Sequence, residues 1–272
     1  MNLIKNLIPK KYKNKARSFY GKYLQFYHEK LQFINFKFPQ ETSYLYHLKN
    51  KTCLEIGGPS FFFRNVIRTY NVLKSVDNVN YAQDTIWKLK TKSGEKNIYN
   101  FHKTKDGYQY LSEGNNLNII KNHSYDCIMS CHVIEHLANP IGAILEWKKK
   151  IKKNGYFLSV IPYAKYTFDH KRPTTKISHL IEDYEKNMQE NDQTHLEEII
   201  SLHDFSLSKW DTHENILKHA KNNAQTRILH HHVFDLNLVE QIYEFCKIRI
   251  LLKSTLSKIL PSIIILGVIE NN

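Results

Sequence analysis

The sequence has few cysteines, and none of them has the spacing of a metal or redox motif. The four are Cys53, Cys127, Cys131 and Cys246. Each lies in or beside an apolar run, and no C-x-x-C pair occurs. This pattern argues against a disulfide framework and indicates reduced, buried thiols, as in cytoplasmic proteins.

Long apolar runs are also missing. The longest near the end, "IILGVI", is far too short to span a bilayer. The first residues, "MNLIKNLIPKKYKNKAR", have neither the continuous apolar segment nor the small-residue cleavage site of a signal peptide. We therefore expect a cytoplasmic protein, and contact with the inner face of the membrane stays open.

Acidic residues are in the minority, and the imbalance is concentrated at one end. The chain of 272 residues has 39 Lys and Arg against 26 Asp and Glu, a net charge of +13. Residues 1–49 form a lysine-rich arm in which tyrosines and leucines recur at helical spacing. Such an arm can attract nucleic acid, an anionic membrane or an anionic substrate, or it can simply be a solvated face.

Short apolar strands alternate with helical segments between residues 50 and 162. Asn139 and Pro140 are typical of a helix start, and Asn154-Gly155 is typical of a helix end. The pattern predicts an α/β fold with a mostly parallel sheet and helices on both faces. The expected strands are Thr52–Ile56, Asn71–Val76, Tyr108–Leu111, Tyr125–Ser130, Tyr156–Val160, Cys246–Leu252 and Ser262–Val268, the last two as an antiparallel pair at one edge.

The first expected strand runs into the turn "EIGGPS". Gly57 and Gly58 are followed by Pro59 and Ser60, and the third glycine of a dinucleotide fingerprint is missing. This disfavours a pyrophosphate ligand such as NAD. S-adenosylmethionine, which has no phosphate, needs a tight turn, an acid near its cationic end and an acid at the end of the second strand. Glu55 and Asp77 suit these two roles.

Four segments in this order resemble class I S-adenosylmethionine-dependent methyltransferases. They are "CLEIGGPS", "SVDN", "SCHVIEHLANP" and "IKKNGYFLSVIP". The resemblance implies a Rossmann-like seven-stranded sheet, mostly parallel with an antiparallel edge strand, and S-adenosylmethionine as cofactor. By this resemblance Glu55, Gly57 and Gly58 line the methionine end, and Asp77 holds the ribose. The remaining implied contacts are adenine at Glu113 and Gly114, and the methyl group beside Cys131 and His132.

The chain then divides into four parts. Residues 1–49 are the basic helical arm, and 50–162 are the cofactor-binding core. Residues 163–234 are polar and rich in histidine, and we interpret them as a helical insertion after strand five that covers the substrate. Residues 235–272 return to the core as a helix and two strands. Segments such as "YTFDHKRPTTKISHLIEDY" also resemble a subgroup of these methyltransferases associated with bacterial capsule and lipopolysaccharide genes.

Histidines of the insertion are candidates for the general base that a hydroxyl acceptor requires. His170 follows strand five. His195 stands one turn before Glu198, on a helix that Asp192 could cap, and His232 precedes the last helix. These three are the predicted catalytic residues, acting as a base or as ligands of a divalent metal. Their spacing matches no zinc signature, so the metal ligands stay unassigned.

The leading function is O-methylation of a sugar or phosphate-type group of a bacterial surface polysaccharide or its precursor, with a glycan or small-molecule acceptor that can be anionic. One alternative is an RNA or DNA methyltransferase, suggested by the basic arm. Ser130-Cys131-His132 stand where base-methylating enzymes have an Asn/Asp-Pro-Pro-aromatic motif, so a nucleic-acid partner is disfavoured. A non-catalytic protein of the same fold is the other alternative.

Overall fold

The computed structural model describes residues 38–82, 98–102, 105–208, 212–256 and 260–270. The predicted amphipathic helix and most of the lysine-rich arm fall within residues 1–37 and lie outside the described residues. The sequence pattern also predicts a helix over residues 82–92, and all of this segment except residue 82 lies outside the described residues.

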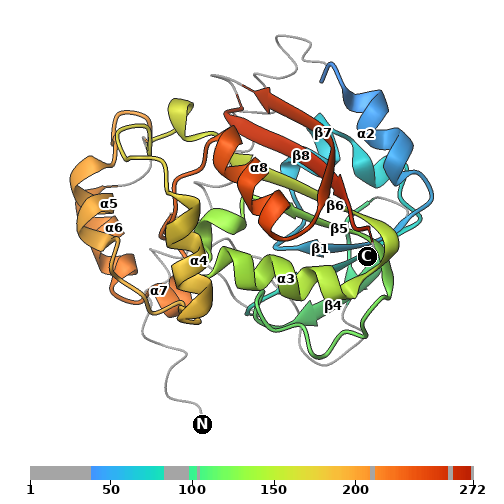
Figure 1. The fold of residues 1–272 in the computed structure, drawn as a ribbon, viewed down its shortest axis with the longest axis horizontal. Helices are drawn as coiled ribbons and strands as arrows, with labels where there is room; N and C mark the ends of the chain where they lie inside the picture. Colours follow the sequence, from blue (N-terminus) through green and yellow to red (C-terminus); the bar gives the residue numbers. More distant parts are fainter. Residues whose placement is uncertain (1–37, 83–97, 103–104, 209–211, 257–259, 271–272) are drawn as a thin grey trace.

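A central sheet organises the described chain, with strand order β3-β4-β2-β1-β5-β6-β8-β7 (Figure 1). Its strands are β1 (Thr52–Ile56), β2 (Ser75–Asn80), β3 (Ile98–Tyr99), β4 (Gly107–Leu111), β5 (Tyr125–Cys131), β6 (Ile151–Pro162), β7 (Arg249–Leu256) and β8 (Ser262–Val268). The neighbouring strands β4, β2, β1, β5 and β6 pair in parallel in this order. Strand β8 runs antiparallel to both of its neighbours, β6 and β7. This confirms the Rossmann-like sheet of seven strands, to which the two-residue β3 adds an eighth. The antiparallel β8 lies one place inside the edge, and β7 forms the edge.

Helices cover both faces of the sheet, with α3 (Pro140–Lys150) and α8 (Leu236–Phe245) on one face and α2 (Glu41–Leu48) on the other. The remaining helices are α4 (Ile177–Glu185), α5 (Leu196–Leu202), α6 (His213–Ala220) and α7 (Asn223–Thr226). Alternate side chains of a strand point to opposite faces. Leu54 and Ile128 therefore pack with α3 and α8, while Cys53 and Met129 pack with α2 on the other face.

The start of α3 agrees with the prediction, but its end does not. The Asn139 side chain accepts a hydrogen bond from the Gly142 N–H at 2.8 Å, and Pro140 is the first helical residue. The helix ends at Lys150, before the predicted Asn154-Gly155, because Ile151 already pairs with Tyr125 at the start of β5. Strand pairing thus stops the helix one turn early.

Two predicted strands are displaced along the sequence. The second was expected over Asn71–Val76, but a 3-10 turn occupies Thr69–Asn71 and β2 runs from Ser75 to Asn80. The strand after α8 was expected over Cys246–Leu252 and is observed as Arg249–Leu256. In both cases local turn geometry delays the strand.

The insertion after β6 is helical, as predicted. Figure 1 shows α4, α5, α6 and α7 gathered at one end of the sheet, where α3 begins. The His231 N–H donates to the Glu135 carbonyl at 2.9 Å, and the Ala138 N–H donates to Glu190 Oε1 at 3.4 Å. The insertion therefore touches the segment that follows the carboxyl end of β5, where open α/β sheets bind ligands.

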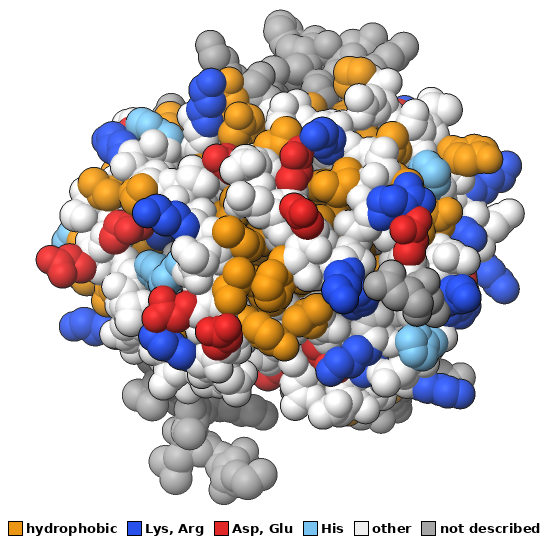
Figure 2. All heavy atoms as spheres, in the orientation of Figure 1, with side chains coloured by type: hydrophobic (Ala, Val, Ile, Leu, Met, Phe, Trp, Pro, Cys, Tyr) orange, Lys and Arg blue, Asp and Glu red, His pale blue; other side chains and the backbone are white. Residues whose placement is uncertain are grey.

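The surface that α3, α4 and α8 share is mixed in character. Figure 2 shows hydrophobic side chains gathered near the middle of this view, with charged groups of both signs around them. Among the described residues, no helix is both long and apolar enough to cross a membrane.

Candidate active site

The turn after β1 presents backbone to the carboxyl edge of the sheet. Gly57 has φ +79° and is exposed to solvent. A Cβ on this residue would lie 2.7 Å from Val133 Cγ2, so glycine is required both by the backbone conformation and by the close neighbour. An exposed glycine at this edge lets a ligand approach the backbone closely. The contact of Gly57 with the methionine end of the cofactor stays a prediction.

Glu55, in β1, supports this turn through a hydrogen bond to its backbone. Its carboxylate is fully buried and accepts hydrogen bonds from Tyr99 at 2.5 Å, from Tyr70 at 2.7 Å and from the Ser60 N–H at 3.1 Å. Burial raises its pKa to about 7, although the tyrosines and the backbone donor oppose the shift. Both Glu55 oxygens already accept hydrogen bonds from the protein, and the contact of Glu55 with the methionine end stays a prediction.

Gly58 is likewise a packing residue. It is buried, and a Cβ there would come within 2.2 Å of Glu55 Cδ. The Asn78 side chain holds it from both sides, with Oδ1 accepting from the Gly58 N–H at 2.9 Å and Nδ2 donating to its carbonyl at 3.2 Å. Gly58 therefore packs between Glu55 and Asn78, and its contact with the cofactor stays a prediction.

Asp77 does not end the second strand, contrary to prediction. It is the third of the six residues of β2, opposite Leu54. Its carboxylate accepts from the Tyr108 N–H at 2.7 Å and from the Tyr125 hydroxyl at 2.6 Å. Asn80 occupies the carboxyl end of β2, because the strand continues for three residues beyond Asp77.

The end of β4 carries the predicted Glu113 and Gly114. Glu113 is exposed and pairs with Arg227 of the insertion at 2.8 Å. The Gly114 carbonyl accepts from the Trp147 indole N–H. Arg227 also lies over the Tyr81 ring, 5.1 Å from its centroid. The insertion thus reaches the edge residues of β2 and β4.

Cys131 and His132 mark the end of β5, as predicted. Cys131 is the last residue of the strand, and burial raises the pKa of its thiol. His132 has φ +52° and an exposed side chain whose Nε2 lies 3.3 Å from Ser262 Oγ. The surrounding protein and the charge of His230 lower the pKa of His132.

His170 points away from this edge. Its Nε2 lies 2.8 Å from Asp204 Oδ2, and about a third of its side chain is exposed. Its neighbour Asp169 points inward instead, 3 % exposed, with Oδ2 at 2.6 Å from His230 Nδ1. The inward residue, Asp169, is therefore one position before the predicted His170. Its partner, His230, is two positions before the predicted His232.

His230, Glu135 and His136 form a cluster beside the end of β5. Their ligand atoms lie within 4.8 Å of one another. Both Glu135 oxygens are buried without a hydrogen-bond partner, and burial raises the pKa of this carboxyl to about 7. Burial alone lowers the pKa of His230, but the Asp169 carboxylate outweighs it and the net pKa is raised. In the sequence, Glu135 and His136 stand out only as part of the segment "SCHVIEHLANP".

Arg172 fixes the geometry of this cluster. Its guanidinium donates to Asp169 at 3.0 Å, to Glu198 at 2.8 Å and to the carbonyls of His230 and His231 at 2.9 and 3.2 Å. A planar guanidinium with several directed donors can hold two chain segments in one arrangement. The Asp169–His230 pair is therefore rigidly positioned.

His195 and His232, the other predicted catalytic residues, come together in a second cluster with His179. The predicted helix around His195 begins one residue later, with His195 itself as the N-cap residue. Asp192 does not cap it, since its oxygens accept from Thr194. The three predicted histidines therefore do not converge at one point: His170 is separate.

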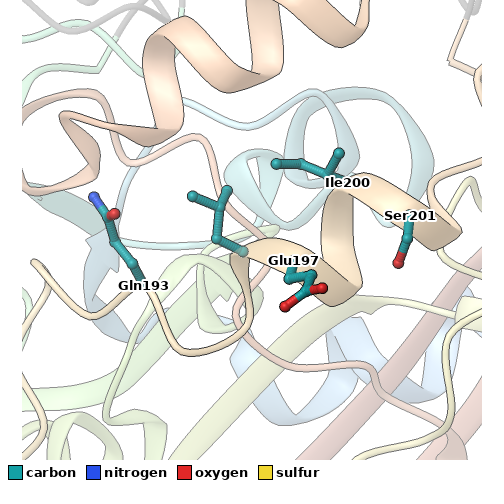
Figure 3. Close-up of a pocket in the computed structure, with 5 residues that line it drawn as sticks. Gln193, Glu197, Ile200 and Ser201 are labelled. Carbon is teal, nitrogen blue, oxygen red and sulfur yellow. The ribbon is translucent and has the colours of Figure 1, made fainter.

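A hollow on the surface beside α5 is lined by residues that belong to neither cluster. Figure 3 shows Gln193, Glu197, Ile200 and Ser201 at its rim. It has no histidine among its lining residues and includes none of the residues at the end of β5.

Residues 54–159 match the sequence family described as a methyltransferase domain. No curated protein matches the chain. Solved structures that resemble it include S-adenosylmethionine-dependent methyltransferases from three organisms. That from Aquifex aeolicus shares 13% identity over 89% of this chain and 97% of its own, with TM-score 0.44. The Methanosarcina mazei protein shares 12% identity over 86% of this chain and 99% of its own, with TM-score 0.48. The Mesorhizobium loti protein shares 10% identity over 85% of this chain and 96% of its own, with TM-score 0.48.

The exposed Gly57 backbone lies at the same edge of the sheet as the polar residues Asn80, which ends β2, and Glu113, which follows β4. The matched segment contains this edge from β1 to β5. The part of the chain that forms this edge therefore matches the methyltransferase domain family.

Proposed function

We propose that the protein methylates an oxygen of a sugar or phosphate-type group in a bacterial surface polysaccharide or its precursor. The observation that carries the proposal is the Asp169–His230 pair at 2.6 Å, beside the carboxyl end of β5. A hydroxyl acceptor must lose its proton, and an oriented histidine suits that task. The resemblance of the insertion to the capsule and lipopolysaccharide subgroup supports the choice of acceptor.

The bound cofactor supplies an activated methyl group for in-line displacement. The chain's residues then have to position the acceptor and accept its proton. Asp169 occupies His230 Nδ1, so Nε2 is the nitrogen that can take the proton. The carboxylate also stabilises the imidazolium that forms, which agrees with the raised pKa of His230.

The acceptor is tested by comparing surface polysaccharide from cells with and without the protein by mass spectrometry. A methyl group lost from a sugar or phosphate-type position supports the proposal. An unchanged polysaccharide, together with salt-dependent binding of the protein to nucleic acid, supports the RNA or DNA methyltransferase alternative and contradicts the proposal.

The role of the pair is tested with His230→Ala and Asp169→Asn on the identified acceptor. We expect kcat to fall by about 10²–10⁴-fold with S-adenosylmethionine affinity little changed. His213→Ala, at an exposed position of the insertion, is the matched control. A loss of turnover in His170→Ala with full activity in His230→Ala would contradict this assignment and restore the earlier one.

A further inference from the structure

The second histidine cluster has no part in the proposed methyl transfer. It joins three segments of the insertion: α4 supplies His179 and Asp183, the start of α5 supplies His195, and the stretch before α8 supplies His232. In the described part of the insertion no strand links these segments. Something other than a sheet must hold them together.

The polar atoms of the cluster face one another at short range. His179 Nε2 lies 3.0 Å from His195 Nε2 and 3.4 Å from Asp183 Oδ2, and His232 Nε2 lies 3.0 Å from the same Asp183 oxygen. A neutral ring nitrogen carries at most one hydrogen. The single hydrogen on His179 Nε2 cannot serve both of its neighbours, whereas a cation can be contacted by the lone pairs of all of them.

The ring positions fit one shared centre. The centroids of His179, His195 and His232 lie 4.9, 5.6 and 5.4 Å apart, and the rings are inclined to one another rather than stacked. With a metal–nitrogen distance of about 2.0–2.1 Å, tetrahedral ligand atoms are about 3.3 Å apart and the ring centroids about 5.2 Å apart. The observed triangle has nearly these dimensions.

The charges are also those of a metal site. His232 and Asp183 are 1 % and 3 % exposed. In the described chain, Asp183 lies beside the ring nitrogens of His179 and His232 and forms no ion pair with Lys or Arg. A bound cation would stabilise a buried carboxylate that has no cationic side chain beside it.

We propose that His179, His195 and His232 bind one divalent transition-metal ion, with the Asp183 carboxylate beside it to balance its charge. Imidazole ligands suit zinc and its neighbours, cobalt and nickel, better than magnesium or calcium. The ion ties α4, α5 and the segment before α8 into one unit. It is a structural site in the insertion, separate from the Asp169–His230 pair.

The test is metal content and metal binding of the purified full-length protein, with Zn²⁺ and Co²⁺ as probes. We expect one ion per chain by plasma mass spectrometry after Zn²⁺ loading and dialysis. X-ray absorption should then show histidine nitrogens at about 2.0–2.1 Å. Zn²⁺ at 100-fold above its Kd should raise Tm by at least about 5 °C over the chelator-treated protein.

Variants locate the ion. His179→Ala and His195→Ala, at partly exposed positions, should weaken Zn²⁺ binding by at least about 100-fold. His213→Ala and Glu135→Gln should bind as wild type. A chain that binds neither metal, or that loses the metal in Glu135→Gln and keeps it in His179→Ala and His195→Ala, overturns the proposal. Circular dichroism confirms that each variant is folded, so that a binding loss is not a folding defect.

Discussion

Glu135 is a buried carboxyl without a partner on either oxygen. Burial raises its pKa from the ordinary 4.5 to about 7, and the nearby His230 opposes the shift. The folded state therefore binds this proton more tightly than the unfolded chain does. Its contribution to the free energy of unfolding is complete below about pH 4.5 and is lost as the pH rises through 7.

Glu135→Gln should remove that dependence. Between pH 5 and 8 the free energy of unfolding of the wild type should fall by up to about 3 kcal/mol through this one group. The variant should not show this loss. Urea denaturation of both proteins at the two pH values measures the difference. Other groups titrate in the same range, so the comparison is between the two proteins' changes in unfolding free energy with pH. Equal changes in wild type and variant would contradict the raised pKa of Glu135.

At the scale of secondary-structure elements, Asp77 connects three strands. It sits in β2 and accepts from the backbone of β4 at Tyr108 and from the side chain of Tyr125 in β5. The Tyr125 hydroxyl thus reaches across β1, which separates β2 from β5 in the sheet. Such a residue stabilises the sheet and has no oxygen left unpaired for a cofactor.

Asp77→Ala should reduce the free energy of unfolding by about 1–3 kcal/mol, because two donors lose their acceptor. S-adenosylmethionine affinity of the folded protein, measured by calorimetry, should stay within about twofold. Asp106→Ala, at an exposed position just before β4, is the control. A large loss of affinity with unchanged stability would instead favour the ribose contact first expected for Asp77.

At the scale of the whole molecule, Arg227 joins the insertion to the core. Its guanidinium pairs with Glu113 at 2.8 Å and with Glu190 at 2.9 Å and covers the Tyr81 ring. The Tyr81 hydroxyl in turn donates to the Gln225 carbonyl at 3.1 Å. The end of α7 is thereby held over the edges of β2 and β4.

Arg227→Gln leaves the buried Glu190 without its cation and should cost about 3 kcal/mol of unfolding free energy. Hydrogen exchange should quicken in residues 213–229, since the contacts that hold α7 to the core are lost. Arg249→Gln is the matched control, because Arg249 forms an exposed pair with Glu270. Unchanged exchange in 213–229 would show that the insertion is held by other contacts.

The sequence by itself determined the order of elements and the sheet. Apolar strands alternating with capped helices indicate a mostly parallel sheet. The bounds of β1 and β8 agree with the predicted strands residue for residue. These features depend on neighbours within a few positions of the chain, such as Asp235 capping α8 through the Leu238 N–H. The helical insertion after the predicted fifth strand followed from the same local signals.

The tertiary structure alone decided which side chains meet. His170 and Asp169 are adjacent in sequence, yet one faces Asp204 and the other His230. Their direction depends on Arg172 and on a segment some sixty residues away. Asp77 likewise has the sequence pattern of a strand end, but pairing with β1 and β4 extends β2 to Asn80. Local patterns specify elements, whereas a site forms from long-range contacts that no short stretch of sequence contains.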